Sequence, residues 1–365
     1  MKRLPRPRNV PPAMRDQDSR ATVSVIIPCF NYGHYLPSCL DSVLSQQGVN
    51  LKVLVIDDLS TDDSASVATR LCAQDDRIEF RRHRDNRGLI ATANEGLEWA
   101  DGDHVVLLSA DDLLVPGSLC RAAAIMKEHP DVGLVYGRPL LARDDGGLPK
   151  PSGRWRSTDI WHGEDWIRTR CSRAESAMSS PEVVVRNSVQ RAVGGYDSRC
   201  QHTSDVNMWL RVAAVSDIAY VRGVPQAIYR VHGASMQRSH VGPLVDLRER
   251  KAAFEAFFGD CGSLLAEPGR LETQARRAMA AEALLRACRT IEGAVTDEQK
   301  AVSEYVEFAL AAYPDARQLS GCRWLKFRRR LGMNGSRRFP PFLATRAGRR
   351  VTFYARRMRW RYQGV

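Results

Sequence analysis

Two adjacent aspartates, Asp111 and Asp112, follow a short apolar run at residues 105–108. The run, V-V-L-L, predicts a buried strand, because a strand covered on both faces does not alternate with polar residues. Two carboxylates at the end of such a strand repel each other and are costly to desolvate. A bound divalent cation would remove this conflict. The alternative is that the pair starts a turn or caps the helix expected after Pro116, where Asp is also common.

A second pair, Asp57 and Asp58, follows another apolar run at residues 51–56. Strands and helices alternate along this half of the chain at a spacing of roughly 25 residues, which predicts a doubly wound α/β sheet. In such a sheet the carboxyl ends of neighbouring parallel strands lie on one edge, where ligands bind. We therefore expect both aspartate pairs to line one crevice. Four uncompensated carboxylates would repel each other there, which again favours a bound ligand.

The elements that must position these pairs can be placed from hydrophobic periodicity and turn residues. The first buried strand, 23–28, should end at Pro28, which has no N–H for the sheet. Residues 138–180 are rich in Gly, Pro, Arg and Trp and predict a loop region with a short helix near 164–169. Further strands are expected at 51–56, 77–82, 105–111, 132–136, 182–186, 219–221 and 226–231, and helices at 35–46, 63–73, 89–99, 119–127, 205–214, 244–258, 270–291 and 296–312.

Composition narrows the class of protein. The 365 residues suffice for one large or two ordinary domains, and 44% apolar with 26% charged residues is ordinary for a globular protein. No apolar run approaches the ~18 residues that span a bilayer. The N-terminus is basic and proline-rich without an apolar core, so we expect no secretory signal. Nine scattered cysteines without a C-x-x-C pair predict free thiols in a reducing cytoplasm, and neither a disulfide framework nor a zinc site.

The net charge of +12 is concentrated at the C-terminal end. Residues 323–365 contain fourteen Lys or Arg and no Asp or Glu, and the rest of the chain is near neutral. Beyond Pro340 and Pro341, aromatic and apolar residues recur at helical spacing among arginines, which predicts a basic amphipathic helix suited to an anionic membrane surface. A disordered solubilising tail is the alternative. Nucleic-acid binding is not expected, because no known reader motif accompanies the charge.

Seven stretches occur in fixed order between residues 22 and 236: V-S-V-I-I-P-C-F-N-Y, V-I-D-D-L-S-T-D, N-R-G-L-I-A-T-A-N-E-G, L-S-A-D-D-L-L, G-G-Y-D, S-D-V-N-M-W-L-R-V-A and Y-R-V-H-G-A-S-M. Together they resemble the family-2 glycosyltransferases of the GT-A fold. The resemblance implies a Rossmann-like, mostly parallel sheet flanked by helices, with a helical C-terminal extension outside it. It also implies transfer of a sugar from a nucleotide-diphosphate sugar, expected to be a UDP-sugar, with Mg²⁺ or Mn²⁺ as cofactor.

The resemblance also implies roles for individual residues. Asp58 would accept a hydrogen bond from the nucleotide base with Asp57 beside it, and Asp111 would lie near the ribose. Asp112 would hold the metal, Asp205 would be the catalytic base, and His232 would be a further ligand of the metal or the diphosphate. The remaining nucleotide-binding residues implied are Pro28, Phe30 and Asn31 in the first loop and Arg87, a basic residue that approaches the nucleotide.

Three positions depart from the family pattern, and three of the implied roles have plain alternatives. Leu59 replaces the usual Gly, Ser204 replaces a frequent Glu before the base, and the metal motif has no third-position Asp. Asp205 could instead cap the helix that it precedes. His232 could be a structural histidine, and Arg87 a solvated surface residue.

The expected reaction is a single displacement with inversion on a hydroxyl acceptor, a glycan or a lipid-linked sugar, by a hexosyltransferase-type enzyme. Synthesis of cell-surface polysaccharide, lipopolysaccharide or glycolipid would suit it. The main alternative is a catalytically silent protein that binds nucleotide sugars as a scaffold at the membrane surface. A nucleotidyltransferase or a dinucleotide-dependent oxidoreductase is disfavoured, because no Gly-rich phosphate loop follows the first strand.

Four segments are expected along the chain. Residues 1–21 should be a disordered basic and proline-rich segment, and 22–240 the GT-A domain. Residues 241–320 should form the helical extension, and 321–365 the basic amphipathic tail. We expect the protein in the cytoplasm, in peripheral contact with the inner face of the cytoplasmic membrane.

Overall fold

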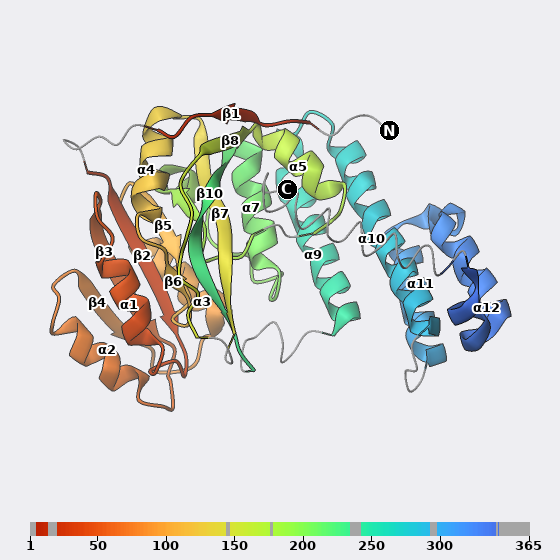
Figure 1. Cartoon of the computed structure of the whole chain (residues 1–365), viewed down its shortest axis with the longest axis horizontal. Coiled ribbons are helices and arrows are strands. Elements are labelled where there is room, and N and C mark those ends of the chain that lie inside the picture. Colours follow the sequence, from red (N-terminus) through yellow and green to blue (C-terminus); the bar gives the residue numbers. More distant parts are fainter. Residues whose placement is uncertain are drawn as a thin grey trace. The chain divides into compact units, whose positions relative to one another are not determined.

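The computed structural model describes residues 5–13, 20–143, 147–175, 178–233, 242–292, 298–340 and 342 (Figure 1). These residues form two compact units. The first is an α/β unit of residues 5–167 and 178–233, and the second is a helical unit of residues 168–175 and 242–342.

The α/β unit is built on a single mixed sheet of ten strands in the order β1-β8-β10-β7-β9-β5-β2-β3-β4, with β6 paired to β10. The strands are β1 (Arg8–Val10), β2 (Thr22–Cys29), β3 (Asn50–Asp57), β4 (Ile78–Arg82), β5 (His104–Leu107), β6 (Leu113–Leu114), β7 (Val132–Arg143), β8 (Ser157–Trp161), β9 (Val184–Arg186) and β10 (Asp217–Val231).

Parallel pairing dominates the part of the sheet that the sequence predicts best. Strand β2 is parallel to both β3 and β5, β3 is parallel to β4, and β7 is parallel to β10. Strands β1, β6, β8 and β9 join by antiparallel pairs. The predicted fold class, a mostly parallel sheet flanked by helices, is confirmed.

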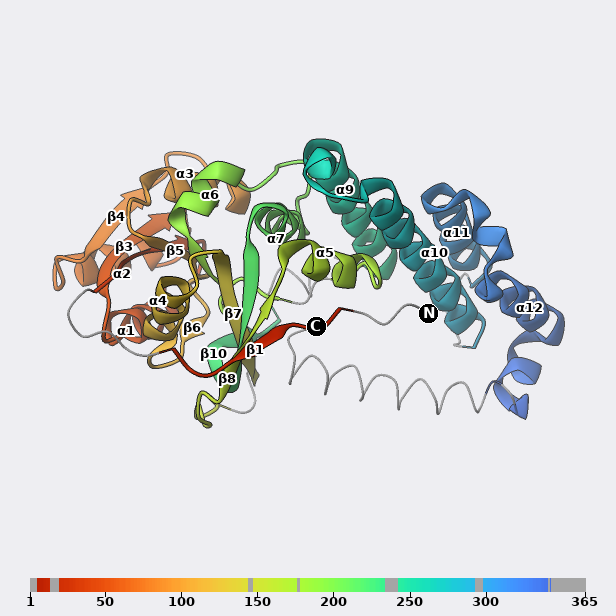
Figure 2. The ribbon, with the colours of Figure 1, turned by 90° about the horizontal axis from the view of Figure 1, so that it is seen from above.

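Helices cover both faces of this sheet (Figure 2). Val25 and Ile27 of β2 belong to the core beneath α1, α2 and α4. Ile26, which points to the opposite face, meets α3 at Gly96, where a Cβ atom would lie 2.2 Å from Ile26 Cγ2. Successive side chains of a strand point to opposite faces, so β2 is buried on both. The helices are α1 (Leu36–Leu44), α2 (Ser64–Cys72), α3 (Gly88–Trp99), α4 (Ser118–Glu128), α5 (Gly163–Cys171), α6 (Asn187–Val193) and α7 (Ser204–Val215).

The expectation that the first strand ends at Pro28 is wrong. Pro28 pairs with Ile56, and β2 continues to Cys29. Cys29 O accepts a bond from Asp58 N on the β3 side, whereas Ile26 O accepts one from Leu108 N on the β5 side. Alternate residues of a parallel strand face alternate neighbours, so the Pro28 nitrogen faces the side where β5 has already ended. No ladder bond is lost there, and the strand tolerates the proline.

Two segments predicted to lack regular structure also contribute strands. Part of the N-terminal segment expected to be disordered forms β1, which runs antiparallel to β8 from Arg8 opposite Ile160 to Val10 opposite Thr158. The expected loop region contributes β8 itself and the last residues of β7. Both strands are short or irregular in sequence, and they are stabilised by pairing with residues far away in the chain, which local periodicity does not reveal.

The two short strands predicted at 219–221 and 226–231 are one long strand, β10. It pairs with β7 along its whole length, with register shifts between Val221 and Pro225 and again between Pro225 and Ala227. Extra residues in one strand of a pair form bulges that bend the strand without ending it. This strand therefore carries residues 229–231, and His232 directly after it, to the region of the aspartate pairs.

The helical unit contains α9 (Pro243–Cys261), α10 (Pro268–Glu292), α11 (Glu298–Ala312) and α12 (Ser320–Arg338). Arg250 of α9 is buried and bonds through Nη2 to Asp246 Oδ2 at 3.0 Å and to Glu282 Oε2 of α10 at 2.9 Å. Arg286 also pairs with Asp246 and Glu282, so the two helices share one ion-pair network. None of the helices in the described part of the chain is long and apolar enough to cross a bilayer. The predicted amphipathic helix beyond Pro341 lies outside the described residues.

Candidate functional site

Asp111 and Asp112 lie in the loop between β5 and β6, and the end of β10 holds both of them. The Arg230 backbone N–H donates to Asp112 Oδ1 at 2.9 Å. His232 Nε2 lies 3.0 Å from Asp111 Oδ2. Both aspartates are buried. Burial, and then the charge of Asp111, raise the pKa of Asp112 well above its usual value.

This pair is chemically suited to a divalent cation. Two adjacent buried carboxylates are hard oxygen donors whose mutual repulsion a cation relieves. Among the described residues there is no cluster of three or more His, Cys, Asp or Glu side chains placed to hold a metal by themselves. Mg²⁺ is often held by one or two carboxylates, with substrate phosphates completing its ligands, so the pair fits that donor set.

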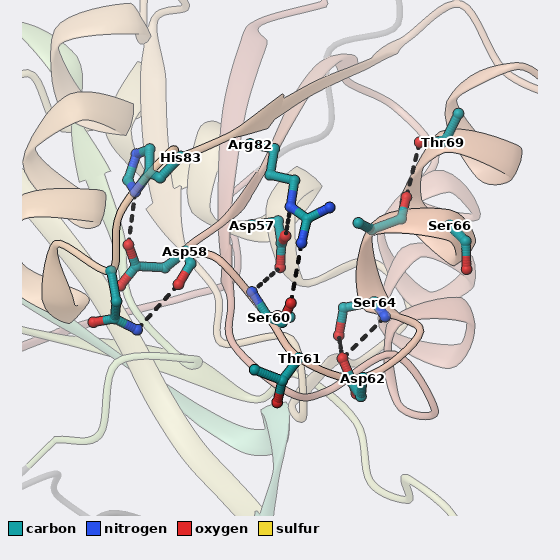
Figure 3. Close-up of polar contacts among 12 residues, drawn as sticks. Asp57, Asp58, Ser60, Thr61, Asp62, Ser64, Ser66, Thr69, Arg82 and His83 are labelled. Atoms are coloured by element: carbon teal, nitrogen blue, oxygen red, sulfur yellow. Dashed lines mark hydrogen bonds and ion pairs between the residues drawn. The ribbon is translucent and has the colours of Figure 1, made fainter.

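The pair after β3 has a different character, because each carboxylate already has partners (Figure 3). Asp57 Oδ2 lies 3.0 Å from Arg82 Nε, and its Oδ1 accepts a bond from the Ser60 N–H at 3.2 Å. Our premise that all four aspartates are uncompensated is therefore wrong for this pair. Neutralisation by Arg82 explains why Asp57 can be fully buried. The electrostatic argument for a cation rests on Asp111 and Asp112 alone.

Asp58 anchors the start of α3. Its Oδ1 accepts a bond from the Arg87 backbone N–H and its Oδ2 one from the Gly88 N–H, each at 2.8 Å. His83 Nδ1 lies 2.7 Å from the same Oδ1. The first N–H groups of a helix lack intrahelical partners, and a carboxylate there is also favoured by the helix dipole. The Arg87 side chain, proposed to approach the nucleotide, pairs with Glu95 at 2.6 Å.

The first loop connects the two aspartate pairs. Asn31, which has a left-handed backbone with φ of 58°, accepts a bond from Thr61 N–H on its Oδ1 at 2.8 Å, and its own N–H donates to Ser60 Oγ at 2.9 Å. On its other side, the Tyr32 ring meets the His232 ring edge-on at 5.5 Å. The loops after β2, β3 and β5 therefore meet at the carboxyl edge of the sheet, as the predicted topology requires. Phe30 in this loop is 45% exposed, and Pro28 lies within β2.

Asp205 is the second residue of α7 and is not its cap, which is Thr203. The Val206 N–H donates to Asp205 Oδ1 at 2.7 Å. Removal of the carboxyl from water outweighs this bond and raises the pKa of Asp205 to about 6. A carboxyl with that pKa is ionised at neutral pH and still basic enough to accept a proton.

Tyr229 of β10 links Asp205 to the pair after β5. Burial is the main cause that raises the pKa of Tyr229 to about 12, and the charges of Asp112, Asp111, Glu182 and Asp205 follow in that order. Four carboxyl groups from three separate segments of the chain thus affect the pKa of this one phenol. The aspartate pair and the predicted base act on the same region.

Sequence reasoning missed several residues of this region. Tyr229 and Arg230 lie within the stretch Y-R-V-H, whose histidine alone was singled out. His83 belongs to none of the stretches singled out, yet it contacts both Asp58 and Glu95. Glu182 belongs to no motif, and no sequence signal marks its burial.

The α/β unit is similar to known proteins. Residues 24–177 match the model of a family described as glycosyl transferase family 2. This match covers less than half of the chain, and it makes the α/β unit similar to glycosyl transferase family 2. The match starts inside β2 and includes both aspartate pairs, and it ends before Glu182 and Asp205.

The chain is also similar in sequence to proteins of two bacteria. An uncharacterized protein of Mycobacterium tuberculosis is 29% identical over 211 residues, which cover 56% of this chain and 65% of that protein. The uncharacterized glycosyltransferase YibD of Escherichia coli is 26% identical over 234 residues, or 61% of this chain and 65% of YibD. The chain therefore spans just under two thirds of the length of these relatives.

The fold is shared with TarS of Staphylococcus aureus, solved as residues 1–349 in complex with UDP-GlcNAc. The TM-score is 0.55 at 16% sequence identity, and the match covers 81% of this chain and 92% of that one. At this identity the similarity concerns the fold alone.

Proposed function

We propose that this glycosyltransferase moves a hexosyl group from a nucleotide-diphosphate sugar to a hydroxyl acceptor with inversion. The observation that carries the proposal is the convergence on Tyr229 of a buried aspartate pair and a separate carboxyl, Asp205, whose pKa is about 6. A donor diphosphate needs its charge neutralised, and an acceptor hydroxyl needs a base. The aspartate pair would serve the charge neutralisation, and Asp205 would serve as the base.

The loops after β2 and β3 are proposed to bind the nucleotide. Asp58 accepts three hydrogen bonds, two on Oδ1 and one on Oδ2, so Oδ2 keeps acceptor capacity for an N–H group of the base. Asn31 fixes the loop after β2 against the loop after β3. TarS is solved with UDP-GlcNAc, which supports a UDP-sugar as the first donor to test.

Asp112 is proposed to hold Mg²⁺ or Mn²⁺, with Asp111 next to the ribose and His232, which contacts Asp111, as a further ligand of the metal or the diphosphate. When bound, such a cation supplies charge neutralisation for the leaving diphosphate. The Arg230 guanidinium, which lies over the Tyr35 ring at 4.7 Å, adds a second positive charge close to Asp112. These contacts fix the pair before the substrate arrives, and this preorganisation favours the transition state.

Asp205 is proposed to take the proton of the acceptor hydroxyl as its oxygen attacks the anomeric carbon. A base on the face opposite the leaving diphosphate makes the reaction a single displacement, which inverts the anomeric centre. The hydroxyl proton moves to Asp205, and the bond between the sugar and the diphosphate breaks as the new glycosidic bond forms.

The described part of the basic tail supports an acceptor at a membrane, such as a lipid-linked glycan. On α12 the side chains of Arg323, Lys326 and Arg330 are exposed next to Trp324 and Phe327, which are 46% and 36% exposed. Cations flanked by aromatic rings favour an anionic membrane surface. We propose a peripheral location at the cytoplasmic face and a role in surface-glycan synthesis.

Calorimetry tests the central proposal. UDP, GDP and CDP are titrated into the full chain with Mn²⁺ and with EDTA, and again into Asp112→Ala. Metal-dependent binding of one nucleotide that the variant loses is the expected result. Absence of binding by a folded wild-type chain would contradict the proposal. A nucleotide-sugar-binding scaffold without catalysis is separated by turnover, because it would bind the donor and release no nucleoside diphosphate when acceptors are added.

A further inference from the structure

Glu182, two residues before β9, is a buried acid with one carboxyl oxygen that has no hydrogen-bond partner among the described residues. Its side chain lies in the protein interior, with only 1% of the residue exposed. Oε1 accepts a bond from the Ser179 backbone N–H at 2.6 Å. Oε2 is also buried, and it has no hydrogen-bond partner among the residues that the structure describes. Native proteins rarely leave a buried carboxyl oxygen unsatisfied, so this atom calls for a ligand.

The charge of this carboxyl affects the pKa values of residues in the proposed site. Its charge contributes to the raised pKa of Asp112, after burial and Asp111, and to that of Tyr229. Asp205 in turn adds to the effect of burial on the pKa of Glu182, which lies well above its usual value. Glu182 therefore interacts both with the aspartate assigned to the diphosphate side and with the assigned base.

We propose that Glu182 is a sugar-binding residue, whose Oε2 exchanges a hydrogen bond with a hydroxyl group of the transferred sugar. This inference rests on the proposed function. In that reaction the anomeric carbon lies between the diphosphate at Asp112 and the base Asp205, so the sugar ring occupies the region that Glu182 shares with both. A sugar hydroxyl both donates and accepts, so it matches the carboxyl in either protonation state.

Three substitutions of Glu182 test this role. Glu182→Met keeps the length and removes both oxygens. Glu182→Asp keeps the acid and withdraws it by one methylene. Glu182→Gln keeps an acceptor for the Ser179 N–H and a donor toward the sugar. The matched control is Glu98→Gln on α3, an exposed glutamate away from the aspartate pairs.

The readout is calorimetry on the full chain with Mn²⁺, in which UDP and GDP are compared with UDP-GlcNAc, UDP-glucose and GDP-mannose. We expect the Met and Asp variants to bind the nucleoside diphosphate like the wild type and to lose roughly tenfold in affinity for the matching nucleotide sugar. Gln should lose less than about threefold, because it restores a hydrogen bond. Thermal unfolding identifies a variant that fails to fold. If the Met variant fails, the affinities of the Asp variant test the inference.

Two outcomes would overturn the inference. In one, the Met and Asp variants bind the nucleotide sugar as tightly as the wild type. In the other, the variants lose as much affinity for the nucleoside diphosphate as for the nucleotide sugar. That result would assign Glu182 to the cation or diphosphate instead of the sugar. A wild-type chain that binds no nucleotide at all would sink the proposed function itself, and this result is independent of the variants.

Discussion

His83 lies between two acids: its Nδ1 is 2.7 Å from Asp58 Oδ1, and its Nε2 is 3.1 Å from Glu95 Oε2. The histidine follows β4, Asp58 follows β3 and Glu95 lies on α3. One buried side chain thus fixes the carboxylate proposed to read the nucleotide base against the helix that the same carboxylate anchors. The orientation of Asp58 depends on this histidine as well as on the helix N-terminus.

His83→Phe should weaken nucleotide binding by roughly tenfold, since a hydrogen bond to a charged group contributes about 1.5–3 kcal/mol. The ring volume is kept, so packing changes little. Calorimetry with the nucleoside diphosphate that the wild type prefers measures the effect, with His129→Phe as the control. An unchanged Kd would mean that the Arg87 and Gly88 N–H groups hold Asp58 without help.

Activity should fall as the pH drops through about 6, because the pKa of Asp205 is raised to about 6 by burial and a base must be ionised to accept a proton. Above that pH the carboxylate is available, and below it the group is already protonated. A pH profile of kcat/KM for the donor, which reports ionisations of the free enzyme, checks this expectation.

Asp205→Asn should lower kcat by roughly 10²–10⁴-fold while leaving donor binding intact, because the amide cannot take up the proton. The variant should also lose the activity step near pH 6. Asp41→Asn, at an exposed position on α1, serves as the control. Full activity of the Asn variant would remove Asp205 from the role of base.

Gly96→Ala should destabilise the α/β unit by about 1–3 kcal/mol, because the new methyl group would lie 2.2 Å from Ile26 Cγ2 in a fully buried part of the core. Chemical denaturation followed by circular dichroism gives the free energy of unfolding. Gly259→Ala on α9 is the matched control. A Cβ atom there meets no described atom within 4 Å, and alanine should stabilise that helix by about 0.5–1 kcal/mol. Equal effects at both sites would contradict the packing argument.

Replacing Arg323, Lys326 and Arg330 of α12 by Gln should reduce binding to vesicles that contain anionic lipid, at about 1 kcal/mol for each lost charge. Binding of the wild type should weaken with added salt, because screening shortens the reach of the charges. The control removes the same charge from Arg70, Arg84 and Arg154, which are exposed in the α/β unit. If the control loses as much as the α12 variant, the attraction is a matter of net charge and α12 has no special role.

The sequence predicts the buried parallel strands and the position of the aspartates well, because both follow from local patterns. An apolar run marks β2, β3 and β5, and a polar residue after each run marks the edge of the sheet. It cannot predict β1 or β8, whose stability comes from pairing across about 150 residues. Sequence also failed to show that Asp57 is neutralised, because Arg82 reaches it from the neighbouring strand.

Glu182 illustrates a different limit. The residue follows Pro181 and precedes three valines. This context predicts a strand and does not indicate a functional role. Its burial results from tertiary packing, and its unused oxygen becomes visible only when every hydrogen-bond partner can be checked. In the same way, His232 could be flagged as a histidine near the site, but its contact with Asp111 required coordinates.

The register shifts of β10 determine which of its residues face Asp111 and Asp112. Along the strand, Val221 is opposite Gly137, Pro225 is opposite Arg138 and Ala227 is opposite Pro139, and the ladder then runs evenly to Val231. Residues 229–232 reach Asp111 and Asp112 only with this offset. Shortening the bulge by a single residue would turn alternate side chains of β10 to the opposite face, since side chains on a strand alternate. The protein should therefore tolerate sequence variation in this bulge far more readily than a change in its length.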